Sequence, residues 1–204
     1  QFEKQYLSRI NILGNNVTDE KVIRDNLEVD EGDPFNSLLL AKSINNLKSL
    51  NIFGNVEYKL LDGDVDKKIL NLTVEEKPTG EISAGAGTGT SGGTLAFGIK
   101  ENNFLGKGVS LDSNFLLSEE SFKGKFAFTN PNYKNSDKSL SLSFQAIEND
   151  NMEKFGYKSN KTGIDIGTNF EYLDDFRLGL GLSNFYEVIK TDSTASEAQQ
   201  KQKG

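Results

Sequence analysis

Up to residue 78, the hydrophobic residues of the chain follow strand and helix spacings in turn. Residues 7–13 alternate as in a short strand. Thr18 then stands where a helix N-cap is expected, and the hydrophobic residues after it predict a first helix. A second helix is predicted to start at Asn36 or Ser37. Its hydrophobic residues recur at i, i+4, i+7 and i+10, namely Leu40, Ile44, Leu47 and Leu50.

Two alternating segments complete this first part of the chain. Residues 53–61 and 69–76 lie on either side of Asp62-Gly63-Asp64, and this arrangement predicts a β-hairpin. The element order is therefore β-α-α-β-β over about 75 residues, which is typical of a small α+β domain.

After residue 78 only strand alternation remains. Seven segments of roughly 8–11 residues, a length that crosses a bilayer obliquely, carry hydrophobic side chains on one face and polar ones on the other. Tight turns are predicted at Asn102-Asn103, Pro131-Asn132 and Asp174-Asp175, and looser polar links at residues 148–161 and after Lys190. The predicted strands are centred on residues 82–90, 94–101, 109–117, 122–129, 139–146, 164–170 and 176–183.

Two architectures have strands that alternate in this way. A soluble β-sandwich needs one wet face, but here long polar and charged side chains recur on strand after strand, which favours an antiparallel transmembrane barrel. Seven strands do not close a barrel, and an open edge in lipid would leave backbone groups unpaired. We therefore expect the carboxyl end to be cut. Residue 1 is glutamine with no signal sequence before it, so we expect the same of the amino end.

Composition narrows the possible functions. The 204 residues include no cysteine and no histidine, which disfavours a hydrolytic or zinc enzyme, and we predict no catalytic residue, no metal site and no cofactor. The net charge of −7 argues against nucleic acid as a partner, because phosphate binding needs a basic surface. A mean hydropathy of −0.51 does not oppose a barrel, whose strands are polar on one face.

Longer stretches of the sequence resemble a known family. Residues 7–76 resemble a POTRA domain, on INILGNNVTDEKVIRDNLEVDEGDPFN (10–36) and INNLKSLNIFGNVEY (44–58). The remainder of the chain resembles the barrel start of the POTRA-plus-barrel outer-membrane assembly factors of the bacterial surface antigen superfamily. The matching pieces are the glycine-rich 85–93, ENNFLGKG (101–108), FTNPNY (128–133) and GIDIGTNFEYLDDFRLGLGL (163–182).

The resemblance implies a POTRA domain over residues 1–78, the last of a series, and the first strands of an outer-membrane β-barrel over residues 79–204. Members of this family fold and insert β-barrel proteins into the outer membrane without nucleotide or covalent chemistry. The implied partners are outer-membrane lipoproteins of the assembly complex, unfolded outer-membrane protein substrates and the lipid bilayer. The alternative is a related POTRA-barrel transporter for protein secretion, in two-partner secretion or autotransporter assembly.

The first candidate site is the glycine-rich strand. Strands of small residues hold a neighbour weakly and define its register poorly. Such a strand either is thin for packing beside the POTRA domain or, as the resemblance implies, forms a lateral gate whose edge templates an incoming strand. The gate residues are Ile82, Ser83, Ala84, Gly85, Ala86, Gly87, Thr88, Gly89 and Thr90.

Two further candidate sites lie in the POTRA segment. Residues 53–61 form a predicted edge strand that either adds an extended peptide by backbone pairing or pairs with nothing. The residues concerned are Phe53, Val56, Tyr58 and Leu60. Arg24 and Glu31 flank the loop between the predicted helices; the resemblance implies that they bind a periplasmic lipoprotein, and the alternative is a solvated charged surface. Asn102, Asn103 and residues 106–108 are assigned to a turn.

Overall fold

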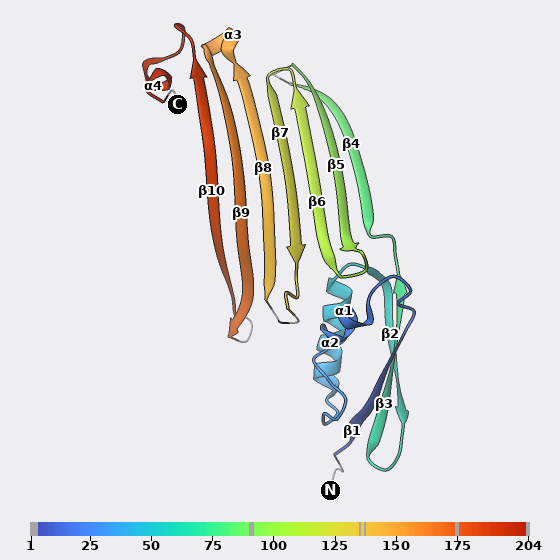
Figure 1. Cartoon of the computed structure of the whole chain (residues 1–204). Helices are drawn as coiled ribbons and strands as arrows, with labels where there is room; N and C mark the ends of the chain where they lie inside the picture. The colour runs from blue at the N-terminus through green and yellow to red at the C-terminus, as the bar shows by residue number, and fades with distance from the viewer. Residues whose placement is uncertain (1–3, 90–91, 135, 137, 174–175, 203–204) are drawn as a thin grey trace. The chain divides into compact units, whose positions relative to one another are not determined.

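The computed structural model describes residues 4–89, 92–134, 136, 138–173 and 176–202 (Figure 1). These residues fall into two units. The first comprises the chain up to Thr79 together with Asn102–Val109, and the second comprises Gly80–Glu101 and the residues from Ser110 onward. The short segment Asn102–Val109 thus makes its contacts with the first unit, although it lies between two strands of the second.

The first unit has the predicted β-α-α-β-β order. Strand β3 lies in the centre of its three-stranded sheet, parallel to β1 on one side and antiparallel to β2 on the other. The chain passes from β1 through the two helices to the outer strand β2, and then turns back into β3. The elements are β1 (Tyr6–Leu13), α1 (Glu20–Arg24), α2 (Ser37–Ser49), β2 (Phe53–Asp62) and β3 (Lys67–Glu76).

The sheet and the helices enclose one hydrophobic core. Helix α2 contributes the predicted face, and Asn36 is its N-cap, with the side-chain oxygen accepting from the amides of Leu38 and Leu39. The prediction of Thr18 as the first N-cap is wrong: Asp19 takes that position without a side-chain cap bond, and Thr18 is buried. The core consists of Leu7, Ile10, Ile23, Val29, Leu40, Ile44, Leu47, Ile52, Phe53, Val56, Leu70, Leu72 and Val74.

The second unit is a sheet in which the seven predicted strands follow one another in chain order, β10-β9-β8-β7-β6-β5-β4 (Figure 1). This antiparallel sheet after a POTRA-like domain confirms the predicted fold class. The strands are β4 (Gly80–Gly89), β5 (Gly92–Phe104), β6 (Val109–Ser118), β7 (Ser121–Asn130), β8 (Ser139–Asn151), β9 (Tyr157–Leu173) and β10 (Phe176–Thr191). Two short helices, α3 (Met152–Phe155) and α4 (Glu197–Gln200), follow β8 and β10.

Some strand ends differ from the prediction. The expected link at 148–161 is wrong, because β8 runs to Asn151 and β9 starts at Tyr157. The hairpin β8–β9 continues beyond its hydrophobic residues, and there ion pairs join the two strands. Lys158 Nζ lies 2.6 Å from Glu148 and 3.1 Å from Asp150. Likewise the predicted turn residues 102–103 belong to the end of β5, and the turn comes after them. The predicted turn at 174–175 lies outside the described residues.

Cross-strand pairs separate the two faces of this sheet. One face pairs hydrophobic residues, such as Phe126 with Phe144, and the other pairs polar ones, such as Ser143 with Asp165. Leu182, on the hydrophobic face, is 71% exposed. Of the helices in the described part of the chain, none has the length and apolarity needed to span a membrane.

Candidate functional site: free strand edges

Strand β4 carries the predicted gate residues and ends the seven-stranded sheet. Within the described residues it pairs only with β5, in a register that runs from Gly80↔Glu101 to Gly89↔Gly92. All ten residues of β4 are exposed. The structure thus places the gate residues 82–89 on one free edge, while Thr90 lies outside the described part of the chain.

Three of the four glycines of β4 have no neighbours that require them. A Cβ atom added at Gly85, Gly87 or Gly89 would meet no atom within 4 Å. Gly98, on β5, is different: its Cβ would lie 2.6 Å from Ser83 Oγ and 2.8 Å from an Asn114 side-chain oxygen. Packing against the described chain therefore does not account for the small residues of β4.

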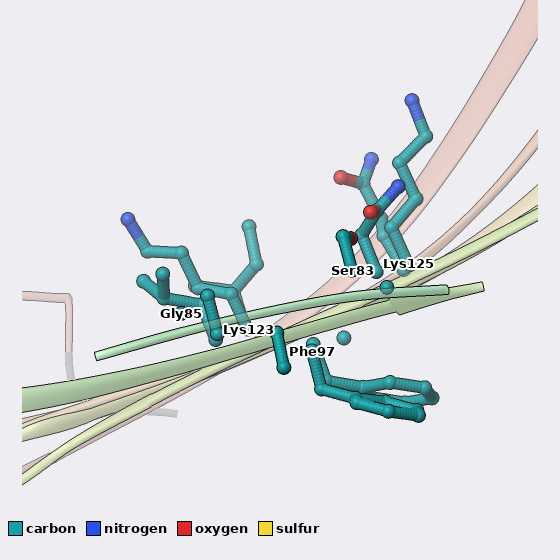
Figure 2. Close-up of a pocket in the computed structure, with 14 residues that line it drawn as sticks. Ser83, Gly85, Phe97, Lys123 and Lys125 are labelled. Carbon is teal, nitrogen blue, oxygen red and sulfur yellow. The ribbon is translucent and has the colours of Figure 1, made fainter. Parts of the chain in front are cut away.

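A hollow of about 550 Å³ lies against the sheet from β4 to β8. Its lining includes Ser83 and Gly85 from β4 and Lys123 and Lys125 from β7. Figure 2 shows both lysine side chains on the same side of the strands as Ser83, whereas the ring of Phe97 lies on the other side. The face that carries long polar side chains in the middle of the sheet is therefore almost bare at its β4 edge.

In the first unit, β2 is an end strand, as predicted. The side chains of Phe53 and Val56 are only 5% exposed and belong to the core, against which Leu60 also packs. Tyr58 is 47% exposed. Three of the four predicted residues thus hold the strand to its own domain, and any strand added here would pair with the β2 backbone rather than with these side chains.

Strand β1 is the other end of this sheet, but its outer edge is already occupied. The amide of Leu7 donates to the carbonyl of Asp33 at 2.9 Å, and the carbonyl of Leu7 accepts from the amide of Gly32 at 2.7 Å. The amide of Phe35 donates to the carbonyl of Gln5 at 2.7 Å. The loop before α2 thus lies along β1 as a neighbouring strand would.

Arg24 and Glu31 continue this closure. Glu31 Oε1 accepts from the amide of Ile10 at 2.9 Å, and Arg24 Nη2 donates to the carbonyl of the same residue at 3.1 Å. Arg24 Nε also lies 2.7 Å from Glu20, and its Nη1 lies 3.8 Å from Glu31. The two charges predicted as a partner surface do lie together, and they supply the pair of backbone contacts that another strand would make at Ile10.

Sequence reasoning missed a third cluster, around Glu76. Its carboxylate accepts from the amides of Asn16 at 3.0 Å, Val17 at 3.0 Å and Thr18 at 2.6 Å. Partial burial raises the pKa of the Glu76 carboxyl, but hydrogen bonds from the Thr18 hydroxyl and these three amides lower it further than burial raises it. The pKa therefore lies below its ordinary value, and Glu76 is a fixed negative charge inside the loop that follows β1.

Comparison with known proteins agrees with both units. Residues 5–77 match the POTRA family model, described as a surface antigen variable number repeat, and residues 103–203 match the Omp85 superfamily domain. The chain is 31% identical over 131 residues to the outer membrane protein assembly factor BamA of Neisseria meningitidis serogroup B, covering 63% of this chain and 16% of that protein. It is 27% identical over 209 residues to BamA of Neorickettsia risticii, covering 96% of this chain and 27% of that protein.

Solved structures agree on the fold. The crystal structure of BamA from Haemophilus ducreyi lacking POTRA domains 1–3 has a TM-score of 0.76 at 24% identity, covering 92% of this chain and 36% of that one. CdiB from Acinetobacter baumannii has a TM-score of 0.65 at 14% identity, covering 96% and 40%. The chain thus spans about a quarter or less of the two curated relatives named above.

Proposed function

The chain belongs to the family in which a POTRA domain precedes an Omp85 barrel domain, and on that premise we propose that it is part of the machinery that folds and inserts β-barrel proteins into the outer membrane. The two relatives named above are called outer membrane protein assembly factors, which supports this function. We place the boundary between the POTRA domain and the barrel segment at residues 78 and 79. The barrel segment lies in the outer membrane and the POTRA domain in the periplasm.

Strand β4 is the working edge in this proposal. An edge strand presents unpaired N–H and C=O groups that template another strand. The observation that carries the proposal is the open space around Gly85, Gly87 and Gly89, where a side chain would meet nothing. Glycines contribute little cross-strand packing, so pairing along this edge is weak and easily exchanged. A lateral gate needs an edge with this property, because one strand must leave it before another can pair.

The hydrophobic face of the sheet contacts lipid, and the POTRA domain receives the protein partners. Partly exposed hydrophobic side chains cover that face from β7 to β10, namely Phe126, Phe144, Ile166, Leu180 and Leu182. In the POTRA domain β2 is the free edge for an extended segment of an unfolded substrate, because β1 is closed. Arg24 and Glu31 lie at the surface where an outer-membrane lipoprotein of the assembly complex binds. No chemical step is required, since strand exchange makes and breaks only hydrogen bonds.

Photo-crosslinking in the full-length protein tests the gate. A benzoylphenylalanine at Ile82 of β4, on the hydrophobic face, should capture a barrel-forming substrate during assembly several-fold more than one at Phe144. Phe144 is the matched control, because it lies on the same face but in the interior strand β8. Equal capture at the two positions would refute strand templating at β4.

The same experiment separates assembly from the alternative, protein secretion by a related POTRA-barrel transporter. An assembly factor yields crosslinks to polypeptides that end as folded barrels in the outer membrane. A secretion transporter yields crosslinks to polypeptides that leave the cell. Capture of exported polypeptides alone would assign the chain to the transporter branch of the family.

A further inference from the structure

The turn between β5 and β6 is seated in the first unit. Of the residues Asn102–Val109, Asn103 is only 7% exposed and Val109 is 6% exposed, although both lie at strand ends. The carbonyl of Gly106 accepts from the amide of Asp19 at 2.8 Å, and Gly106 and Gly108 are also buried. The turn is therefore held against the loop between β1 and α1.

A hydrogen-bonded relay runs from this turn to Glu76. Asn103 Nδ2 donates to Thr18 Oγ1 at 2.9 Å, and its side-chain oxygen accepts from the amide of Gly108 at 2.7 Å. The Thr18 amide donates in turn to Glu76 Oε1 at 2.6 Å. Thr18 is 2% exposed. Thr18 thus links Asn103 to Glu76 through its side chain and its backbone amide, and buried hydrogen bonds of this kind favour one geometry.

The glycines of the turn fit this docking and no larger residue does. Gly106 has φ +72°, and a Cβ added there would lie 2.1 Å from the carbonyl oxygen of Val17. Gly108 has φ +63°, and its Cβ would lie 2.9 Å from Val22 Cγ1. Two constraints therefore act on the residues of ENNFLGKG (101–108): they must form the turn, and they must approach the loop of residues 14–19 closely.

The same end of the hairpin β4–β5 is tied down a second time. The amide of Asn102, near the end of β5, donates to the carbonyl of Thr79, immediately before β4, at 3.2 Å. Both residues belong to the first unit.

We propose that Glu76, Thr18 and Asn103 form a latch that holds the β5–β6 turn on the POTRA core and so anchors the Thr79–Asn102 end of the hairpin β4–β5. These three are positioning residues. The latch does not depend on what the barrel assembles.

Hydrogen exchange on the full-length protein tests the latch. In Asn103→Ala, exchange of the Asp19 and Gly108 amides should accelerate at least tenfold, since both amides are protected by the docked turn. Leu72, in the core strand β3, should keep its protection and so report an intact POTRA fold.

Matched variants separate the latch from general damage. Asn102→Ala removes the neighbouring side-chain amide, whose Nδ2 lies 3.5 Å from the Thr79 carbonyl oxygen, and should leave Asp19 exchange within twofold of wild type. Thr18→Val should accelerate exchange of the same amides as Asn103→Ala does. Thr18→Ser keeps the hydroxyl and should leave them as protected as in the wild type. This pair tests the latch even if Asn103→Ala fails to fold. Unchanged Asp19 exchange in both Asn103→Ala and Thr18→Val would overturn the latch.

Discussion

The two units treat hydrophobic residues in opposite ways. The first buries thirteen of them in one cluster that lies wholly between Leu7 and Val74. In the second, Ala195 is the one hydrophobic residue that is buried among those described, and large side chains such as Leu182 are exposed. The first unit therefore contains its own source of stability, whereas the sheet depends on strand pairing and on the surroundings of its hydrophobic face.

Glycines show the same contrast at single positions. In the first unit, Gly14 and Gly106 combine a left-handed backbone with a carbonyl oxygen about 2 Å from the site of a Cβ atom. In β4, Gly85 and Gly87 have open space there. Glycine is thus a steric requirement where the chain is locked and a source of weak pairing where an edge is offered.

Alanine substitutions should separate these two kinds of glycine by the largest effect. Gly14→Ala should lower the free energy of unfolding of residues 1–78, expressed alone, by about 4 kcal/mol, because it adds left-handed strain to a backbone clash with Val74. Urea unfolding measures the loss. Gly87→Ala should leave the folded, heat-modifiable fraction of the full-length barrel unchanged. A mild effect of Gly14→Ala, or misfolding of Gly87→Ala, would break the comparison.

Truncation of leucines should give the next largest difference. Leu72 is fully buried, so Leu72→Ala should destabilise residues 1–78 by about 3 kcal/mol. Leu182→Ala, on the exposed face of β10, should change the thermal midpoint of the detergent-solubilised protein little. Cooperative urea unfolding of the isolated segment is itself expected, since its core is complete. A random-coil circular dichroism spectrum would instead show that the core needs the barrel.

The sequence predicts the elements well because their spacing is local. The i, i+4, i+7 recurrence in α2 and the strand alternation from residue 82 follow directly from which face is buried. Strand ends at β8 and β9 could not be predicted, because there Lys158 pairs with Glu148 and Asp150 and hydrophobic alternation has stopped. Charge pairs across strands depend on register, which spacing along one strand does not fix.

In the candidate site, too, local features could be predicted from the sequence and contacts between distant residues could not. Small residues mark β4 in the sequence, whatever their neighbours are. The roles of Thr18, Glu76 and Asn103 depend on contacts between residues as many as 85 apart, and Thr18 looks like a helix cap in isolation. The contacts by which Arg24 and Glu31 close the edge of β1 could not be predicted from the sequence either. A register shift between Leu7 and Arg9 changes which backbone groups of β1 face outward, and the local sequence does not predict this shift.

The Glu76 carboxylate gives a pH-dependent prediction of intermediate size. Glu76→Gln should destabilise residues 1–78 by about 2 kcal/mol at pH 7, as expected for loss of charge-assisted hydrogen bonds. The folded pKa of Glu76 lies below the pKa of a glutamate in the unfolded chain, which is about 4.3. The stabilisation is therefore complete above the unfolded pKa and is lost as pH falls through the folded one. The stability difference between wild type and variant should therefore shrink toward acid pH in urea titrations. A constant difference would mean that the charge is not what holds the loop.

The smallest effect concerns the closed edge of β1, and it decides what Glu31 does. Glu31→Gln weakens the bond to the Ile10 amide and should cost about 1 kcal/mol, because the pair is half-exposed. Glu20→Gln is the matched control: it removes the other carboxylate on Arg24 but touches no β1 backbone group. In native-state hydrogen exchange, the Ile10 amide should lose protection in the first variant and keep it in the second.

Lipoprotein binding by charge-reversed and neutral variants of Glu31 tests whether this side chain contacts the partner. If Glu31 acts directly on the partner, charge reversal to Lys should weaken capture of the lipoprotein much more than Glu31→Gln does, since a charge pair becomes a like-charge contact. If Glu31 supports binding indirectly, because the partner needs the closed edge, both variants should weaken capture in proportion to the lost Ile10 protection. Unchanged capture by both would leave the closed edge as the whole role of Glu31, and β2 as the one edge of this sheet open to a strand among the described residues.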